Sequence, residues 1–178
     1  MRLSLLPSLF VLVAALCLST ASFGQNSKEP TTTEATPTIL FVCEHGAAKS
    51  VIAAAYFDKL AKERGLNYRA VFRGTNPDPV LAVAAEKGLK EDGIDTRDWK
   101  PEIVTKKDLD AASAVVTLGC ALPDKEPAAG KLMEWNDTPS VGQNYQAARA
   151  YLVKQVQSLI DDLAKKESEA KGQKKEKP

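Results

Sequence analysis

The feature that most constrains the fold is a short apolar run that passes directly into a helical pattern. Residues 38–42 read Thr-Ile-Leu-Phe-Val, a run without charge that is rich in β-branched side chains. Such a run is typical of a buried strand in a parallel sheet, which is covered on both faces. Residues 50–64 then repeat small and apolar side chains at helical spacing and end before Gly65. A strand followed at once by a helix indicates an α/β sheet.

The same alternation continues along the chain. The other predicted strands are residues 68–72, 114–118 and 131–135, and the other predicted helices are residues 78–92 and 143–163. Since strands alternate with helices, we predict a single three-layer α/β domain with a four-stranded parallel sheet. Ligands bind such sheets beyond the carboxyl ends of the strands, so the residues that follow each strand are candidates for a site.

The two ends of the chain differ from its middle. Residues 1–24 start with Met1-Arg2, continue as an uncharged apolar run and end in small residues, as a secretory signal peptide does. We therefore expect a periplasmic or secreted protein, with a membrane anchor as the alternative if this segment is not cleaved. Residues 25–37 are rich in Thr and polar side chains and are predicted to be a flexible tether. Residues 38–164 are the expected domain, and residues 165–178, mostly Lys and Glu, are an expected disordered charged tail.

Charge argues against one class of partner. The chain carries 24 Lys and Arg and 23 Asp and Glu. A balanced chain without a basic cluster in its folded part offers no electrostatic attraction for nucleic acid. No group of His, Cys, Asp and Glu has the sequence spacing of metal ligands. We expect neither a metal nor an organic cofactor.

Cys43 stands where the first predicted strand meets the first predicted helix. The segment reads Cys-Glu-His-Gly-Ala-Ala-Lys-Ser over residues 43–50, and we call residues 43–48 the Cys43 loop. Backbone N–H groups of such a loop and of the first helical turn converge and bind an oxyanion. Gly46 permits the positive φ that folds the loop back on itself. A cysteine beside a helix N-terminus is biased toward the thiolate, so the segment suits nucleophilic attack on a tetrahedral substrate.

This segment resembles the Cys-x5-Arg-Ser/Thr loop of low-molecular-weight protein tyrosine phosphatases and thioredoxin-coupled arsenate reductases. Other stretches agree in order. Residues 73–75, Arg-Gly-Thr, resemble the Ser-Ala-Gly-Thr after the second strand of the family. Residues 88–95 resemble its Leu-x-x-x-Gly-Ile-Asp, and residues 115–118, Val-Val-Thr-Leu, resemble a later strand. The resemblance implies a phosphotyrosine phosphatase I-like fold for residues 38–164.

The resemblance also implies a role for each residue of the segment. Cys43 would take the phosphoryl group, and Ser50 would hydrogen-bond the thiolate and ease its departure. The substrate would be held by the residues that follow the nucleophile, Glu44, His45, Gly46, Ala47 and Ala48. Lys49 stands where the family has Arg, and it offers a point charge on a flexible stem instead of a planar fork. We expect this substitution to slow catalysis by on the order of a hundredfold or more without abolishing anion binding.

The general acid matches the family less closely. The family has an Asp-Pro pair after the last strand, whose Asp protonates the leaving oxygen. Here residues 135–139 read Trp-Asn-Asp-Thr-Pro, with one residue between Asp137 and Pro139. Asp137 is the candidate for the general acid. The alternative is a turn or helix-capping Asp, because a shift of one residue in a loop misaims a side chain.

Cys120 follows the strand predicted at residues 114–118, at the same edge of the sheet as Cys43. The similar arsenate reductases have a resolving Cys there and a further Cys a few residues on, which residues 121–127 lack. Three interpretations remain for Cys120: a resolving thiol served by an external thiol donor, a disulfide with Cys43, or an inert core cysteine. His45 is the only histidine, and it is either a substrate contact that favours the thiolate or a solvent-facing loop residue.

Three functional hypotheses follow. The first is hydrolysis of phosphomonoesters, phosphotyrosine included, through a phosphocysteine on Cys43. The second is an arsenate reductase-type thiol oxidoreductase that uses Cys43 and Cys120. The third is a catalytically weak protein that binds an inorganic oxyanion or a phosphorylated partner, which Lys49 and the displaced Pro139 favour.

Overall fold

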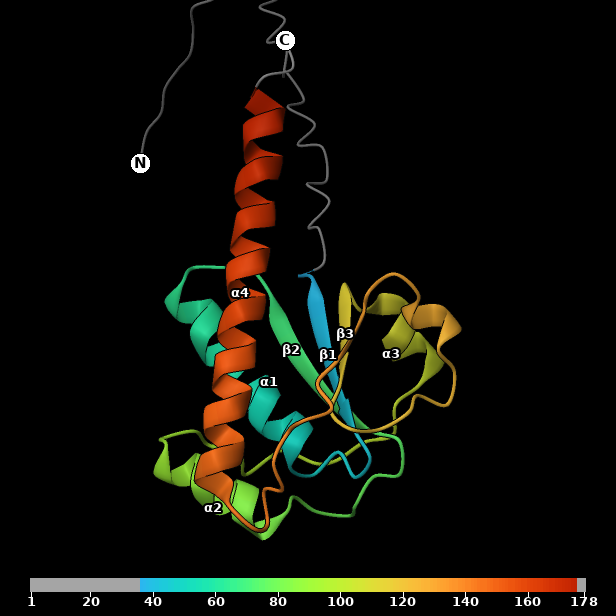
Figure 1. Ribbon diagram of the computed structural model, residues 1–178, viewed down its shortest axis with the longest axis vertical. Coiled ribbons are helices and arrows are strands. Elements are labelled where there is room, and N and C mark those ends of the chain that lie inside the picture. Colours follow the sequence, from blue (N-terminus) through green and yellow to red (C-terminus); the bar gives the residue numbers. More distant parts are fainter. Residues whose placement is uncertain (1–35, 176–178) are drawn as a thin grey trace, which may run out of the picture. The chain divides into compact units, whose positions relative to one another are not determined.

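The computed structural model describes residues 36–175 (Figure 1). The expected signal peptide and most of the expected tether lie outside the described residues. The elements in chain order are β1 (Thr38–Cys43), α1 (Lys49–Glu63), β2 (Arg69–Gly74), α2 (Val83–Glu91), α3 (Lys106–Ala111), β3 (Ala114–Thr117), the short 3-10 helix η1 (Glu126–Ala128), β4 (Leu132–Glu134) and α4 (Tyr145–Lys175).

The strands form one parallel sheet of four strands in the order β2-β1-β3-β4, which confirms the predicted fold class. In the register, Val42 of β1 lies beside Arg73 of β2 and Thr117 of β3. The chain moves to one side of β1 to form β2 and to the other side to form β3. The strand order therefore reverses at β1, and the carboxyl end of β1 is where such sheets leave a crevice for a ligand.

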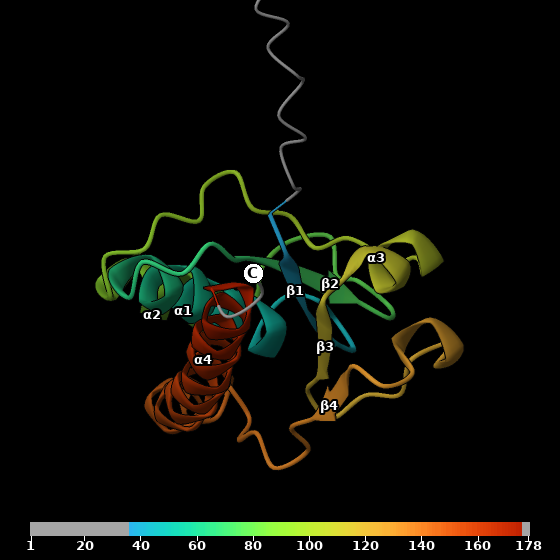
Figure 2. The same ribbon diagram turned by 90° about the horizontal axis from the view of Figure 1, so that it is seen from above.

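Residues of β1 point alternately to the two faces of the sheet. Ile39, Phe41 and Cys43 belong to the cluster that includes side chains of α1 and α4, whereas Leu40 and Val42 belong to a second cluster on the α3 side. Figure 2 shows α1, α2 and α4 on one side of the sheet and α3 on the other. Helices on both faces make the three predicted layers.

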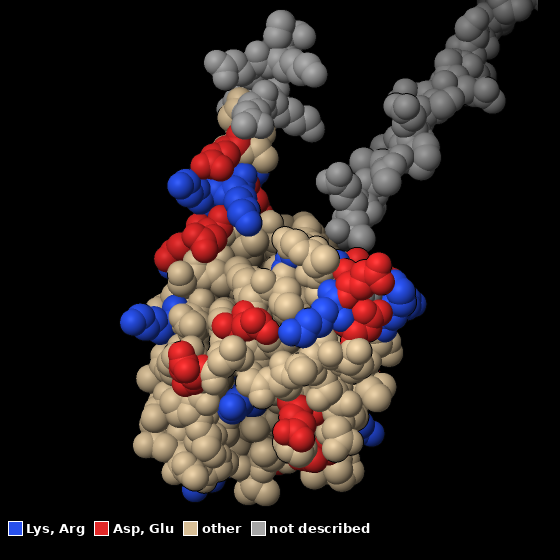
Figure 3. All heavy atoms as spheres, turned by 45° about the vertical axis from the view of Figure 1, so that its right-hand side comes forward, with Lys and Arg blue, Asp and Glu red and all other residues tan. Residues whose placement is uncertain are grey.

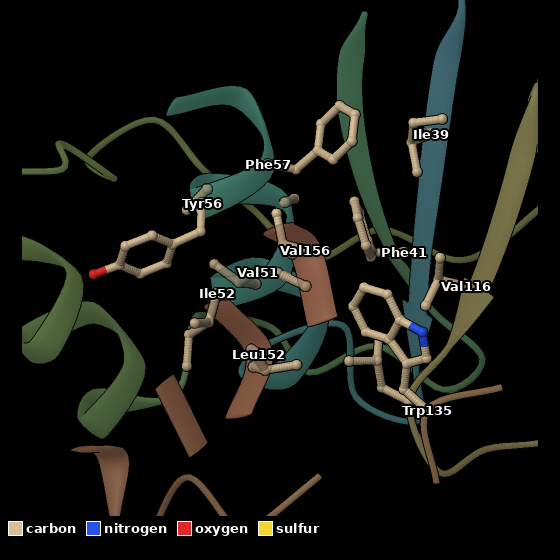
Figure 4. Close-up of a cluster of buried hydrophobic side chains, with 14 of the residues drawn as sticks. Ile39, Phe41, Val51, Ile52, Tyr56, Phe57, Val116, Trp135, Leu152 and Val156 are labelled. Atoms are coloured by element: carbon tan, nitrogen blue, oxygen red, sulfur yellow. The ribbon is translucent and has the colours of Figure 1, made fainter. Parts of the chain in front are cut away.

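In the larger cluster, Phe41 of β1 packs against two other aromatic side chains. The ring of Phe41 lies 5.8 Å from that of Phe57 on α1 and 5.8 Å from that of Trp135, which follows β4 (Figure 4). Phe41 and Phe57 are fully buried, and Trp135 is 8% exposed. Burying large aromatic side chains of this kind stabilises a fold by about 1.5–3 kcal/mol each. This packing fixes β1 and α1, and therefore the loop between them.

Helix α2 starts at Val83, later than the predicted start at residue 78. Two prolines, at positions 77 and 79, interrupt the helical hydrogen bonding there. The backbone N–H groups of the segment donate instead to carbonyl oxygens of the Cys43 loop. These bonds run from Asn76 to Glu44 at 2.8 Å, from Asp78 to His45 at 3.0 Å and from Ala82 to Ala47 at 2.9 Å.

Two glycines allow this close approach between the loop and β2. Gly46 has a φ of +59°, and a Cβ on it would lie 2.8 Å from the backbone nitrogen of Gly74. A Cβ on Gly74 would in turn lie 2.8 Å from the backbone nitrogen of Gly46. Real Cβ atoms do not come so near to backbone, so both positions exclude a side chain. The positive φ expected at Gly46 is confirmed.

Helix α3 was not predicted, although the sequence carries a signal for it. Thr105 and Asp108 form a capping box, in which the Thr105 side chain accepts from the Asp108 N–H and the Asp108 carboxylate accepts from the Thr105 N–H. Thr followed three residues later by an acidic residue is the usual pattern of this motif. The helix is short, and only Leu109 is buried.

Helix α4 extends to Lys175, so the expectation of a disordered tail is wrong for residues 165–175. Residues 176–178 lie outside the described part. Lys and Glu are good helix formers, and adding residues to an existing helix is much easier than starting one. The ion pair of Lys171 with Glu167, one turn away, supports this extension.

A cluster of polar side chains attaches α4 to α1 and to the end of α2. The carboxylate of Asp92 accepts hydrogen bonds from the hydroxyls of Tyr56 (2.7 Å) and Tyr145 (2.6 Å), and it pairs with Nε of Arg149 (2.9 Å). Burial raises the pKa of both phenols, so both remain protonated donors. Burial also opposes the charge on Asp92, but the bonds from Tyr145 and Tyr56 and the Arg149 charge outweigh it and lower the pKa of Asp92.

In the described part of the chain, no helix combines the length and the apolar character needed to cross a membrane. On the face shown in Figure 3, acidic and basic side chains are interspersed, and neither sign forms a continuous patch.

We expect Asp92→Asn to lower the free energy of unfolding by about 2–3 kcal/mol, because buried donors lose a charged acceptor. The change is measured by urea denaturation. Asp95→Asn is the control, since Asp95 is an exposed carboxylate paired with Arg97, and stability should stay close to that of the wild type. A carboxylate with a lowered pKa stabilises the fold above about pH 3.9 and loses that effect as the pH falls through its folded value, so the two variants should converge at acid pH. Equal stability of both variants at neutral pH would contradict the assignment.

Gly74→Ala is expected to destabilise the protein by about 1–3 kcal/mol, because the new methyl group would meet the backbone of the Cys43 loop. Gly142→Ala is the matched control, since an added Cβ there meets nothing within 4 Å. Thermal unfolding of the two variants beside the wild type measures the difference. A Gly74→Ala protein as stable as Gly142→Ala would show that the two backbones are not in contact.

Candidate functional site

The Cys43 loop leaves its backbone N–H groups unpaired. Four of its carbonyl groups accept hydrogen bonds from the segment 75–82. In the part of the chain that the structure describes, the N–H groups of residues 44–49 have no acceptor, and Ala48 caps α1 without a side-chain hydrogen bond. Unpaired N–H groups at the start of a helix bind anions. This arrangement has the unpaired donors that the predicted oxyanion cradle requires, and we refer to it as the cradle.

Cys43 and Ser50 lie together at the base of this cradle. The Sγ of Cys43 is 3.1 Å from the Oγ of Ser50, and both residues are buried, with Cys43 5% exposed. Cys43 ends β1 and Ser50 belongs to the first turn of α1, so the strand and the helix fix the distance between them. A hydroxyl at this distance hydrogen-bonds a thiolate and stabilises it when it leaves a covalent intermediate.

The cradle opens into a pocket of about 450 Å³. The Cys43 loop and α1 form one wall of this pocket. The other wall comes from the end of β3 and from the loop before α4. The lining residues are Cys43, Glu44, His45, Ala48, Lys49, Leu118, Gly119, Thr138, Ser140, Val141 and Gly142. The wall made by residues 138–142 was not predicted, although a loop rich in small residues that follows a strand at the carboxyl edge is a signal for it.

Lys49 is half-buried and extends across the pocket. A Cβ built on Gly119 would lie 3.5 Å from the Nζ of Lys49, so the ammonium lies directly beside the turn after β3. Gly119 has a φ of +73°, which favours glycine, and a Cβ there would be in ordinary contact with the ammonium. Lys49 thus places a positive charge at the mouth of the cradle.

His45 lies at the mouth of the pocket between two carboxylates. Its Nδ1 is 3.2 Å from Oδ1 of Asp78, and its Nε2 is 3.8 Å from Oε2 of Glu44. All these side chains are about half exposed or more. His45 lines the pocket, as a substrate contact would, and its side chain is about half exposed, as in a solvent-facing residue. Both interpretations of His45 therefore stay open. The pairing with Asp78 was not predicted, because only the bonds between the segment 75–82 and the Cys43 loop bring the two together.

Asp137, the expected general acid, does not line the pocket. It is exposed on the loop after β4, whereas its neighbour Thr138 is buried and donates to the carbonyl of Trp135 at 3.0 Å. This bond turns Thr138 and the residues after it inward and leaves Asp137 outside. The residue inserted between Asp137 and Pro139 is the physical reason, since a shift of one position in a loop redirects a side chain.

Cys120 lies at the same edge of the sheet as Cys43, as predicted. Both are free cysteines, and the Sγ of Cys120 donates to the carbonyl of Val42 at 3.5 Å. Burial, together with the neighbouring Cys43, raises the pKa of Cys120 to about 11. The structure contains no bond between the two sulfurs, so the interpretation as a structural disulfide does not describe this state of the protein. Among residues 36–175, no group of three or more His, Cys, Asp and Glu is arranged to hold a metal ion.

Comparisons with known proteins agree with this geometry. The model of the family described as low molecular weight phosphotyrosine protein phosphatase matches residues 38–134. Among solved structures, YfkJ from Bacillus subtilis has a TM-score of 0.64 at 17% identity and covers 75% of this chain and 98% of its own. A low molecular weight protein tyrosine phosphatase from T. tengcongensis has a TM-score of 0.59 at 22% identity and covers 73% and 99%. An arsenate reductase from Archaeoglobus fulgidus has a TM-score of 0.56 at 25% identity and covers 69% and 98%. Comparison with curated proteins finds no match.

The family match contains the whole of the sheet and the Cys43 loop, and it ends at the last residue of β4, before the loop that holds Asp137. The solved structures confirm the fold over nearly the entire length of each relative. Because the family match covers more than half of the chain, the protein belongs to the low molecular weight phosphotyrosine protein phosphatase family, within the superfamily that also holds the arsenate reductases.

Proposed function

We propose that the protein hydrolyses phosphate monoesters, including esters of the phosphotyrosine type, through a phosphocysteine on Cys43. The observation that carries this proposal is the set of unpaired N–H groups of residues 44–49 around a buried thiol at the start of α1. Such groups bind a tetrahedral oxyanion and stabilise the charge that develops during phosphoryl transfer. Family membership supports the same reaction class.

The reaction has two steps. The Cys43 thiolate attacks phosphorus, so that an S–P bond forms while the P–O bond of the ester breaks. Water then attacks the phosphocysteine, a new P–O bond forms, and the S–P bond breaks to release phosphate and the thiolate. The Ser50 hydroxyl, 3.1 Å from Sγ, stabilises the departing thiolate in the second step.

Lys49 is the side chain that binds the phosphoryl oxygens in this proposal. Its ammonium lies at the mouth of the cradle beside Gly119, where it can bind one non-bridging oxygen of the phosphoryl group. A guanidinium would grip two oxygens at once and would fix the orientation of the phosphoryl group as well. Lys49 therefore supports binding better than it supports turnover.

We further propose that the protein acts after export. The support is the pattern of residues 1–24, a basic start, an apolar run and small residues, which is typical of a secretory signal.

A thiol relay of the arsenate reductase type is a second candidate. Its support is the pair of free thiols at one edge of the sheet. The Cys120 thiol donates a hydrogen bond to the carbonyl of Val42, the residue before Cys43. One relative of known structure is named an arsenate reductase. The raised pKa of Cys120 weighs against this candidate, because a protonated thiol is a poor nucleophile.

The first test is hydrolysis of 4-nitrophenyl phosphate by the reduced protein. We expect turnover that Cys43→Ser abolishes and that Lys49→Arg raises by about tenfold or more, since the fork restores a second bond to the phosphoryl group. Lys87→Gln, which removes an exposed charge on α2, is the control and should behave as the wild type. Lys49→Gln should weaken inhibition by inorganic phosphate.

The outcomes separate the three functional hypotheses. Activity that survives Cys43→Ser would exclude a phosphocysteine. Turnover of arsenate with an added dithiol, lost in Cys120→Ser while ester hydrolysis is absent, would favour the relay. Phosphate binding that depends on Lys49, with no turnover of either substrate, would identify a binding protein.

The reactivity of the Cys120 thiol should depend steeply on pH. With a pKa of about 11, Cys120 is a thiolate in on the order of one molecule in ten thousand at pH 7. We expect iodoacetamide to modify Cys120 very slowly at pH 7 and progressively faster up to pH 11, because only the thiolate reacts. Mass spectrometry of the Cys43→Ser variant measures this rate, with the unfolded chain as the control. Rapid modification of folded Cys120 at pH 7 would contradict its protonated state and strengthen the relay.

A further inference from the structure

The proposed hydrolysis needs a proton source that the family match does not supply. The oxygen that leaves in the first step must be protonated unless the alcohol is itself strongly acidic. Asp137 lies outside the pocket, on a loop beyond the end of the family match. The ionisable side chains that line the pocket are Cys43, Glu44, His45 and Lys49. Cys43 is the nucleophile and Lys49 holds the oxyanion, which leaves the pair Glu44 and His45.

His45 is held in one orientation by two contacts with the same residue. Its carbonyl accepts from the N–H of Asp78 at 3.0 Å, and its Nδ1 lies 3.2 Å from Oδ1 of the Asp78 side chain. Asp78 stands between two prolines, whose fixed φ values restrict the backbone there. A carboxylate that holds one ring nitrogen of a histidine selects the tautomer and directs the other nitrogen.

The second nitrogen of His45 is free to meet a substrate. Its Nε2 is 3.8 Å from Oε2 of Glu44, which is too long for a hydrogen bond. Of the two side chains, His45 is the stronger candidate, because Asp78 holds its ring, whereas the side chain of Glu44 is 65% exposed. An imidazole ring can also both give and take a proton, as the two steps require. The charged groups around His45 are Asp78 on the neighbouring segment, Glu44 beside it, and Lys49 and the thiol of Cys43 on the pocket wall.

We propose that His45 protonates the leaving oxygen from Nε2, with Asp78 as its positioning residue; this inference rests on the proposed phosphatase function. As the S–P bond forms and the ester P–O bond breaks, the Nε2 proton passes to the leaving oxygen, and the imidazole becomes neutral. In the second step the neutral imidazole takes a proton from the attacking water, which regenerates the imidazolium while the thiolate departs. No other reactant is needed.

The test compares two esters that differ in their need for a proton. Phenol is about as weak an acid as tyrosine, with a pKa of about 10, so phenyl phosphate needs general acid catalysis. The 2,4-dinitrophenolate leaves without a proton. His45→Gln should lower kcat/KM for phenyl phosphate by about a hundredfold and change kcat/KM for 2,4-dinitrophenyl phosphate by less than about threefold. The ratio kcat/KM is compared because it reports the first step, whereas hydrolysis of the phosphocysteine is common to both esters. Retained activity toward the dinitrophenyl ester shows that the variant is folded and can still form the phosphocysteine.

Asp78 is tested by the same comparison. Asp78→Asn should lower kcat/KM for phenyl phosphate and leave kcat/KM for the dinitrophenyl ester close to that of the wild type, because it alters the orientation of the ring and leaves the cradle intact. A purely structural role for either side chain would slow both esters alike.

The inference and the proposed function fail in different ways. A wild type that hydrolyses both esters, with His45→Gln lowering kcat/KM for both equally or for neither, would overturn the inference alone. Selective loss in Asp137→Asn and not in His45→Gln would also overturn it and would return the proton to the loop after β4. A wild type that hydrolyses neither ester would overturn the proposed phosphatase function and this inference with it.

Discussion

The arrangement of the site depends on the hydrogen bonds between the Cys43 loop and the segment 75–82. A loop of consecutive peptide groups has as many carbonyls as N–H groups, and carbonyls that faced the ligand would repel an anion. Here the segment 75–82 satisfies the carbonyls, because its own N–H groups donate to those of Glu44, His45 and Ala47. The N–H groups of the loop are then left to face inward. Gly46 and Gly74 make the contact close enough, since neither can carry a side chain there. The proposed anion binding therefore depends on how the second crossover connection packs on the first.

The segment 75–82 also fixes the orientation of His45, which lines the pocket. Because Asp78 donates to the carbonyl of His45, its carboxylate reaches the ring of that residue and orients it. The loop after β4 approaches from the opposite wall, and there the bond from Thr138 to Trp135 turns Thr138 inward and Asp137 outward. The family match stops before this loop, so it gives no support to Asp137 as the general acid.

Patterns of buried residues predicted the sheet, its fold class and the edge where the site lies, because a strand covered on both faces has few alternatives. Cys43, Ser50 and Gly46 were predicted for a similar reason, since they adjoin β1 and their positions follow from local geometry. The later start of α2 was missed, although the prolines at positions 77 and 79 signal it in the sequence. The sequence does not show that the N–H groups of this segment donate to the Cys43 loop. The pair of His45 and Asp78 depends on that contact too. For residues 165–175 the composition was read as disorder, although the same Lys and Glu residues extend a helix that is already formed.

The protonation of Cys120 bears on whether the site would survive the proposed export. In an oxidising compartment two neighbouring thiols tend to form a disulfide, which would consume the nucleophile. Disulfide exchange requires a thiolate as the attacking group. Burial and the nearby Cys43 keep Cys120 protonated, with a pKa of about 11, and its Sγ is engaged with the carbonyl of Val42. Cys43 is itself 5% exposed, so an external oxidant reaches it only through the pocket. The features that make Cys120 a poor resolving thiol would therefore also slow its pairing with Cys43, and they would protect the nucleophile of the proposed hydrolysis if the protein acts after export, as we propose.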